Sequence, residues 1–154
     1  DYYLMVKSIA QGFDFSVGYR RQLLTFVYVK DLASAVFDAL ESGVRRKSYL
    51  LTDGKTYTQS EFRSIVKHLL GKRFVVPVKA PLWIVGIVCA IAERIAAAKG
   101  KASTLNRDKY KILRQRNWTC DITPAVNDFG YHPRYDLRQG LEETIRWYRD
   151  NGWL

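Results

Sequence analysis

The sequence predicts an α/β protein in which short strands are mixed with about six helices. Segments with alternating apolar residues are interleaved with longer segments whose apolar residues recur every three or four positions, the periods of strands and helices. Capping residues and glycines stand where several of the longer segments begin and end. The chain has 154 residues, of which 47% are apolar, and this is enough to bury one core without disulfides.

The first forty residues predict a helix, two strands and a second helix. Apolar residues recur at helical spacing from the second residue, and this helix should end near Gly12. Residues 13–17 alternate as a half-buried strand does, while the apolar run at 23–29 suits a strand covered on both faces. Asp31 offers an N-cap for a helix through Leu40. That helix is apolar around most of its circumference, so it needs cover on more than one side.

The next forty residues predict a strand, a helix and another strand. A short strand is expected at 49–52. Thr58 and Glu61 form a capping box for a helix that Gly71 closes. The strand expected at 74–78 contains a proline, which favours the edge of a sheet.

A long apolar helix is expected over 80–98, with Pro81 in its first turn. Its length of about 29 Å approaches the thickness of a bilayer core. Glu93 and Arg94 oppose a membrane span, because each charge costs roughly 2.5–3.5 kcal/mol near the centre of a bilayer. The uninterrupted apolar run covers only residues 82–92, so a buried or interface helix is favoured.

Two more helices are expected before the end of the chain. Thr123, followed by a proline, begins a short helix that Gly130 ends. Asp136 and Gln139 form a second capping box for the last helix, and Gly152 closes it.

The net charge of +10 is the unusual number in the composition. Seven Lys or Arg residues and one acid, Asp108, lie between Lys99 and Arg116. Such a balance suits nucleic acid, an anionic membrane or an acidic protein surface. A basic module that stacks bases on Trp118 is one alternative, and attachment of the apolar helix to a membrane surface is another.

The sequence excludes several kinds of site. It has no GxGxxG or GxxxxGK[ST] motif, and its histidines and cysteines lack metal-ligand spacing. Cys89 and Cys120 are therefore expected to be structural thiols in a reducing compartment. Tyr3 and Lys7 have the spacing that places a phenol and an ammonium on one helix face, as acid/base chemistry requires.

Four segments, in order, resemble one family. LTFVYVKDLASAVFDALE, which starts at Leu24, resembles the F-V-[HY]-V-x-D-[LV]-A segment of the extended short-chain dehydrogenase/reductases, the NAD-dependent epimerase/dehydratase family. Gly18 lies eight residues before Phe26, as the family's hairpin glycine does, and Gln22 fits between them. SYLLTDGKTYTQSEFRSIVKHLLGK and WTCDITPAVNDFGYHPRYDLRQGLEETIRWY are similar to the segments that follow in that family.

The resemblance implies that residues 1–154 are one region, the carboxyl-terminal, substrate-binding lobe of a Rossmann-type enzyme, without the dinucleotide-binding half. Residues 31–52 would complete the sheet of that half. The family's catalytic tyrosine lies further upstream than Tyr3, so no catalytic or cofactor-binding residue is expected in this chain. NAD or NADP would bind to the longer parent protein and not to this region alone.

The implied parent is an NAD(P)-dependent oxidoreductase or isomerase, namely an epimerase, dehydratase or reductase for a nucleotide sugar or a related hydroxyl or keto substrate. This region would be inactive alone. The candidate substrate-binding residues are Ser16, Arg20, Arg21, Tyr28, Arg114 and Arg116. Leu24 and Thr25 stand where nucleotide-sugar enzymes usually carry Arg-Asp, which leaves an apolar, sterol-like alcohol as an alternative substrate.

The resemblance also sets the expected partners. They are the protein's own amino-terminal Rossmann half, a small-molecule substrate, and other copies of the isolated region through its exposed apolar surface. Neither nucleic acid nor a transmembrane span is expected. The expected location is the cytoplasm, with peripheral membrane attachment as an open alternative.

Overall fold

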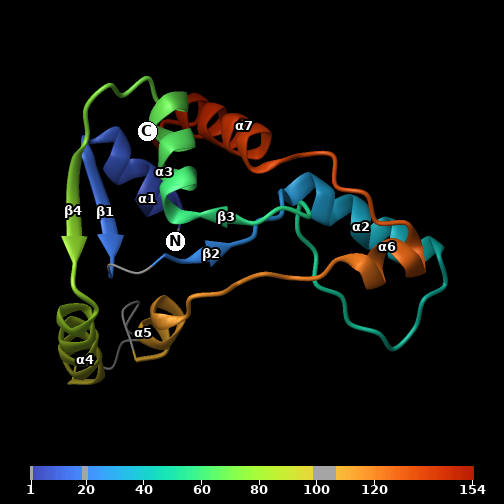
Figure 1. The fold of residues 1–154 in the computed structure, drawn as a ribbon, viewed down its shortest axis with the longest axis horizontal. Helices are drawn as coiled ribbons and strands as arrows, with labels where there is room; N and C mark the ends of the chain where they lie inside the picture. The colour runs from blue at the N-terminus through green and yellow to red at the C-terminus, as the bar shows by residue number, and fades with distance from the viewer. Residues whose placement is uncertain (1, 19–20, 99–106) are drawn as a thin grey trace. The chain divides into compact units, whose positions relative to one another are not determined.

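The computed structural model describes residues 2–18, 21–98 and 107–154 (Figure 1). These residues contain seven helices and four strands. The chain forms two compact units, each made of two separate segments. Unit 1 comprises residues 1–22 and 72–116, and unit 2 comprises residues 23–71 and 117–154.

The sheet of unit 1 consists of two parallel strands. β1 (Phe13–Val17) confirms the first predicted strand, and it pairs with β4 (Val76–Ala80). Phe13 lies opposite Val76 and Val17 opposite Ala80, so the two strands end at the same edge. α1 (Tyr2–Ala10) precedes β1, packs against it and ends two residues before Gly12, as predicted.

The long apolar helix is α4 (Leu82–Ala98), which packs against α5 (Arg107–Arg114). A Cβ at Gly86 would lie 3.2 Å from the ring of Tyr110, so the glycine lets the two helices approach closely. In the part of the chain that the structure describes, no helix combines the length and the apolar character needed to cross a bilayer.

Unit 2 is built around two capped helices. α3 (Gln59–Leu69) begins with the predicted capping box of Thr58 and Glu61, and α7 (Leu137–Asp150) with that of Asp136 and Gln139. The two helices pack against each other, and their buried residues lie at helical spacing. These buried residues are Phe62, Val66, Leu137, Gly140, Leu141 and Ile145.

A second cluster of unit 2 joins α2 (Val29–Glu41) to α6 (Thr123–Phe129). Its buried members are Ala35, Ala125 and Tyr131. α6 ends at Gly130 as predicted, in the left-handed conformation with φ of 70°. Its N-cap, however, is Ile122 and not Thr123, which is the first helical residue.

Two strand predictions for unit 2 are wrong. The run at 23–29 pairs only at β2 (Leu23–Leu24), which is antiparallel to β3 (Tyr57–Thr58), and the helix begins already at Val29. A short apolar run suits either state, and here the helix takes its last residue. No strand forms at 49–52 within the described residues. Side chains in this segment do alternate between inside and outside, but through packing and not through strand pairing. Tyr49 and Leu51 pack on the cluster between α2 and α6, while Leu50 is exposed.

Asp31 does not cap α2, whose N-cap is Tyr28 with no side-chain hydrogen bond. The Asp31 carboxylate is buried and accepts hydrogen bonds from the backbone N–H groups of Arg134 (3.1 Å) and Tyr135 (3.0 Å). It therefore ties α2 to the segment before α7, a long-range role that local spacing does not show.

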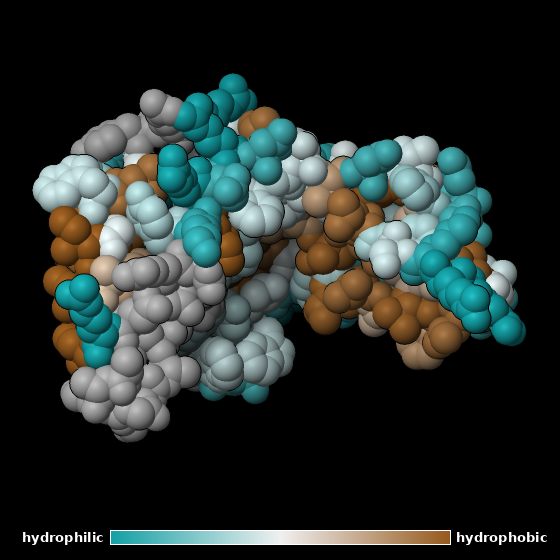
Figure 2. Space-filling view, turned by 90° about the horizontal axis from the view of Figure 1, so that it is seen from below, coloured by the Kyte–Doolittle hydropathy of each residue, from teal (hydrophilic) through white to brown (hydrophobic). Residues whose placement is uncertain are grey.

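Both units leave apolar side chains exposed (Figure 2). On α2 the exposed ones are Val29, Leu32, Val36, Phe37 and Leu40, so the helix predicted to be apolar all round lacks part of its cover in this structure. The thiols of Cys89 and Cys120 are free, in agreement with the prediction.

A candidate ligand pocket at the edge of the parallel strands

A pocket of about 330 Å³ opens in unit 1 where β1 and β4 both end. Carboxyl ends of parallel strands are the usual place for ligands in α/β folds, because loops and helix starts converge there. The lining residues come from the end of β1, the start of α4 and the end of α5. They are Val17, Gly18, Gln22, Leu82, Arg114, Gln115 and Arg116.

Gly18 shapes the floor of this pocket. Its N–H donates to the Ala80 carbonyl oxygen at 2.9 Å, which extends the pairing of β1 and β4 by one residue. Its φ is +75°, and a Cβ would lie 3.3 Å from the Leu82 side chain. Both the left-handed backbone and the close approach of α4 therefore favour glycine here.

Two arginines give the pocket its charge. Arg114 is the last residue of α5 and Arg116 follows two residues later, and both side chains are exposed. Among the described residues that line it, there is no Asp or Glu. The Gln22 side-chain amide donates to the Gln115 carbonyl oxygen and so ties the segment between the arginines to the connection that follows β1. Two guanidinium groups without a carboxylate form a natural site for a phosphate or another anion.

The structure brings together two of the six residues that the sequence suggested for the substrate, Arg114 and Arg116. Ser16 is buried in β1 and is not part of the pocket lining, and neither is the exposed Arg21. Arg20 lies outside the described residues. Val17 and Leu82 were missed because only the pairing of β1 with β4, 63 residues apart, brings them together. Gln115 was missed because its contact in this region is with Gln22, which is distant in sequence.

Tyr28 belongs to unit 2, where its hydroxyl forms a hydrogen bond within the same unit. It donates to Glu143 Oε2 at 2.7 Å, and Lys30 Nζ binds the same oxygen at 2.6 Å. Its ring lies 4.6 Å from that of Tyr135, centre to centre. Burial, followed by the hydrogen bond to Glu143, raises the pKa of Tyr28 to about 12. A phenol so held stays protonated near neutral pH and anchors α7 to the start of α2.

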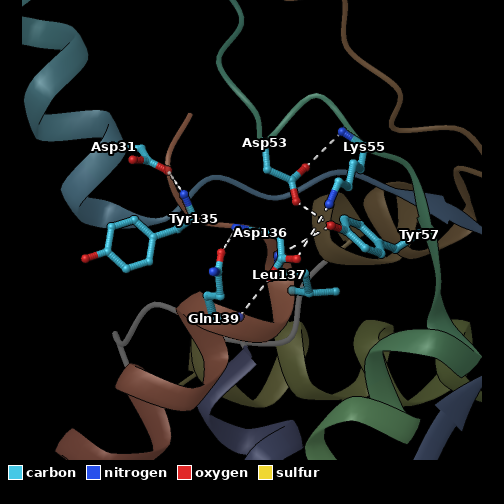
Figure 3. A network of polar contacts seen from close by, with 8 residues as sticks. All are labelled: Asp31, Asp53, Lys55, Tyr57, Tyr135, Asp136, Leu137 and Gln139. Atoms are coloured by element: carbon cyan, nitrogen blue, oxygen red, sulfur yellow. Dashed lines mark hydrogen bonds and ion pairs between the residues drawn. The ribbon is translucent and has the colours of Figure 1, made fainter. Parts of the chain in front are cut away.

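A second polar network fixes the start of α7 (Figure 3). The Tyr57 hydroxyl donates to Asp53 Oδ2 at 2.5 Å and accepts from the Leu137 N–H at 3.4 Å. Lys55 Nζ lies 3.5 Å from Asp136 Oδ2, the N-cap carboxylate of α7. Burial and the bond to Asp53 raise the pKa of Tyr57. These groups satisfy one another, so the network is a structural joint between the 53–57 segment and α7.

Other candidate chemistry finds no site in the described residues. A hollow in unit 2 has an acidic lining that includes Asp31, Asp38, Glu41 and Asp128. Across the ranges 2–18, 21–98 and 107–154, no group of three or more His, Cys, Asp or Glu residues could hold a metal ion. Nor does any described strand lead through a glycine-rich turn into a helix, so a dinucleotide has no cradle in this part of the chain.

The Tyr3–Lys7 pair forms as its spacing predicts, with Lys7 Nζ 3.2 Å from the Tyr3 hydroxyl on α1. Neither residue is among those that line the pocket of unit 1.

Comparison with known proteins gives related sequences, although no family model matches the chain. The uncharacterized protein y4nL of Sinorhizobium fredii is 26% identical over 97% of this chain and 43% of its own length. The uncharacterized protein YbjS of Escherichia coli is 30% identical over 76% of this chain and 33% of its own length. UDP-glucuronate 4-epimerase 6 of Arabidopsis thaliana is 27% identical over 96% of this chain and 30% of its own length.

Solved structures with a similar fold include two nucleotide-sugar enzymes. The dTDP-glucose 4,6-dehydratase DesIV of Streptomyces venezuelae, with NAD and TYD bound, matches 97% of this chain and 38% of its own at a TM-score of 0.69 and 20% identity. The UDP-glucose 4-epimerase of Thermotoga maritima, with UDP-glucose, matches 96% and 38% at a TM-score of 0.67 and 19% identity.

The chain thus spans about 30–43% of the length of these relatives and structures. The relatives and structural neighbours whose names state an activity include nucleotide-sugar epimerases and dehydratases, and two of the solved dTDP-glucose 4,6-dehydratases hold NAD. By sequence and by fold, the chain corresponds to the carboxyl-terminal portion of the NAD-dependent epimerase/dehydratase enzymes, the extended short-chain dehydrogenase/reductases.

Proposed function

We propose that this chain is the substrate-binding region of an NAD(P)-dependent epimerase, dehydratase or reductase, and that the pocket of unit 1 binds the phosphate end of a nucleotide sugar. The observation that carries the proposal is the position of Arg114 and Arg116, which line one pocket at the carboxyl edge of β1 and β4, where no acid is among the described lining residues.

The lining suits a diphosphate with an apolar neighbour. Each guanidinium can make two parallel hydrogen bonds to phosphate oxygens. Val17 and Leu82 provide an apolar wall, and Gln22 with Gln115 adds amide groups. The volume of about 330 Å³ is small for a whole nucleotide sugar, so the pocket would hold only part of the ligand.

In this proposal the catalytic and cofactor groups lie in another part of a longer protein. An amino-terminal Rossmann half would bind NAD or NADP, which accepts and returns hydride. The exposed apolar side of α2, with Val36, Phe37 and Leu40, would pack on that half, and residues 31–52 would complete it. This chain would orient the substrate and exclude water, the positioning that makes transfer between bound groups fast.

The test is ligand binding by the natural full-length protein. UDP and dTDP are titrated calorimetrically against wild type and the double variant Arg114→Ala/Arg116→Ala. We expect at least a tenfold loss of affinity, because each charge-assisted hydrogen bond contributes about 1.5–3 kcal/mol. Uridine and thymidine, which lack phosphate, should bind equally to both proteins.

Arg146→Ala is the matched control, since Arg146 is an exposed arginine of α7 in unit 2. It should leave every affinity unchanged. Equal binding of UDP and dTDP by the double variant and wild type would refute the assignment of the pocket.

A second candidate, a reductase for an apolar alcohol or ketone, is favoured by the residues at the end of β2. Leu24 is apolar, and the Thr25 hydroxyl donates to the Trp118 carbonyl oxygen at 2.6 Å, so neither side chain offers a charge to a phosphate. Turnover of an apolar alcohol without any affinity for nucleoside diphosphates would favour this candidate over the first.

A further inference from the structure

The excess of positive over negative residues lies in unit 1. Unit 1 contains 14 Lys or Arg residues and 4 Asp or Glu residues, whereas unit 2 contains 11 of each kind. The whole net charge of +10 therefore belongs to unit 1. Its exposed basic side chains in the described ranges are Arg21, Lys72, Arg73, Lys79, Arg94, Lys111, Arg114 and Arg116.

The same unit exposes an apolar helix face. Six large side chains of α4 are between 39% and 66% exposed: Trp83, Ile84, Ile87, Val88, Ile91 and Ile95. Their spacing of one, three or four positions places them along one stripe. The opposite side of α4 is covered, since Gly86 lies against Tyr110 of α5 and Cys89 is buried. Hydrophobic residues gather along the left edge of the face drawn in Figure 2, where α4 lies.

We propose that this stripe of α4 rests on an anionic lipid surface and that the basic side chains of unit 1 provide the electrostatic part of the attachment. An apolar stripe alone would suit any apolar partner. Exposed cations accompany it at both ends, with Lys79 three residues before the helix and Arg94 within its last turns. An anionic bilayer matches this combination, because its acyl boundary takes up the apolar stripe and its headgroups attract the cations.

The geometry favours a helix that lies in the interface. α4 has 17 residues and is thus about 26 Å long, and one of its sides is occupied by α5, so lipid can reach only the other side. Trp83 stands in the first turn of α4, and tryptophan prefers the headgroup region of a bilayer. None of the six stripe residues lines the pocket, so the apolar part of this inference does not depend on the pocket or its ligand.

The experiment is sedimentation of the natural full-length protein with vesicles. One set contains phosphatidylcholine alone, and the other contains about one third of the anionic lipid phosphatidylglycerol. Wild type should sediment with the anionic vesicles only, and binding should weaken at least tenfold as salt is raised from about 0.1 M to 1 M, where the Debye length falls from about 10 to 3 Å.

Ile87→Glu/Ile91→Glu tests the stripe, because both positions are exposed and should accept glutamate without unfolding the helix. We expect at least a tenfold loss of vesicle binding. Leu50→Glu, at an exposed apolar position of unit 2, is the matched control and should bind as wild type does. Circular dichroism checks that each variant is folded.

If the double glutamate variant does not fold, fluorescence quenching in the wild-type protein still tests the stripe. Brominated lipids should quench the fluorescence of Trp83, and Trp83→Phe should remove the quenched component. Absence of vesicle binding, equal binding to neutral and anionic vesicles, or no quenching of Trp83 would each overturn the proposal. Dimerisation that Ile87→Glu/Ile91→Glu abolishes, without any vesicle binding, would show that a second copy covers the face, and this would overturn it as well.

Discussion

Units 1 and 2 use their polar residues in different ways. In unit 2, carboxylates bind groups of the same unit: Asp31 holds two backbone N–H groups, Glu143 holds Tyr28 and Lys30, and Asp128 holds Lys47. In unit 1, cations greatly outnumber acids, and most of the described cations are exposed. Internal pairing stabilises a fold, whereas an excess of surface charge of one sign creates a field that attracts an oppositely charged ligand or surface. The difference is consistent with a scaffolding role for unit 2 and with the anion binding that we propose for unit 1.

The largest effect should come from the core of unit 2. Phe62 is buried, and its ring stacks on that of Phe26 at 5.4 Å between centroids. Phe62→Ala should lower the free energy of unfolding by about 3–5 kcal/mol, because it leaves a cavity. Urea denaturation measures the loss. Phe74→Ala, at a residue of unit 1 that is 79% exposed, should change stability by no more than about 0.5 kcal/mol, and an equal loss at both positions would erase the distinction.

A smaller effect is expected where α7 meets Tyr28. A Cβ at Gly140 would lie 3.0 Å from the Tyr28 ring, which Glu143 and Tyr135 hold in place. Gly140→Ala should therefore destabilise the protein by about 1–3 kcal/mol, although alanine is the better helix former by about 1 kcal/mol. In a Tyr28→Ala background the clash is gone, and the same substitution should become stabilising. A destabilisation of equal size in both backgrounds would contradict the contact.

The smallest effect concerns pH. Hydrogen bonds from Lys30 and then Tyr28 hold the pKa of Glu143 below its ordinary value. A depressed pKa in the folded state means that Glu143 stabilises the protein above the unfolded-state pKa, and this contribution disappears as pH falls through the folded-state pKa. Glu143→Gln should flatten the loss of stability in acid, as measured by thermal melts from pH 7 to 3. An unchanged profile would show that the pairing contributes nothing measurable.

Local signals in the sequence predicted the helices well. Both capping boxes, at Thr58–Glu61 and Asp136–Gln139, form as expected, because the groups that make them are three residues apart. β1, and the ends of α3 and α6 at Gly71 and Gly130, follow from equally local patterns. The order of motifs also pointed to the correct family and to its carboxyl-terminal portion.

What failed depended on distant partners. Asp31 resembles an N-cap in its own segment, yet its carboxylate binds backbone more than a hundred residues away. The alternation at 49–52 reflects packing against two helices, which sequence periodicity alone cannot distinguish from strand pairing. The pocket was predicted only at its arginines, because its other walls meet through strand pairing across 63 residues.

The interleaved course of the chain has a consequence for how the protein can be made and cut. Each unit consists of two segments separated by part of the other unit, so no single cut releases either one intact. During synthesis β1 must wait for β4, since the first pair of the parallel ladder joins Phe13 to Val76. Contacts of such long sequence separation form slowly, and a truncation after residue 71 would leave β1 without its partner strand and without the arginines that face the pocket.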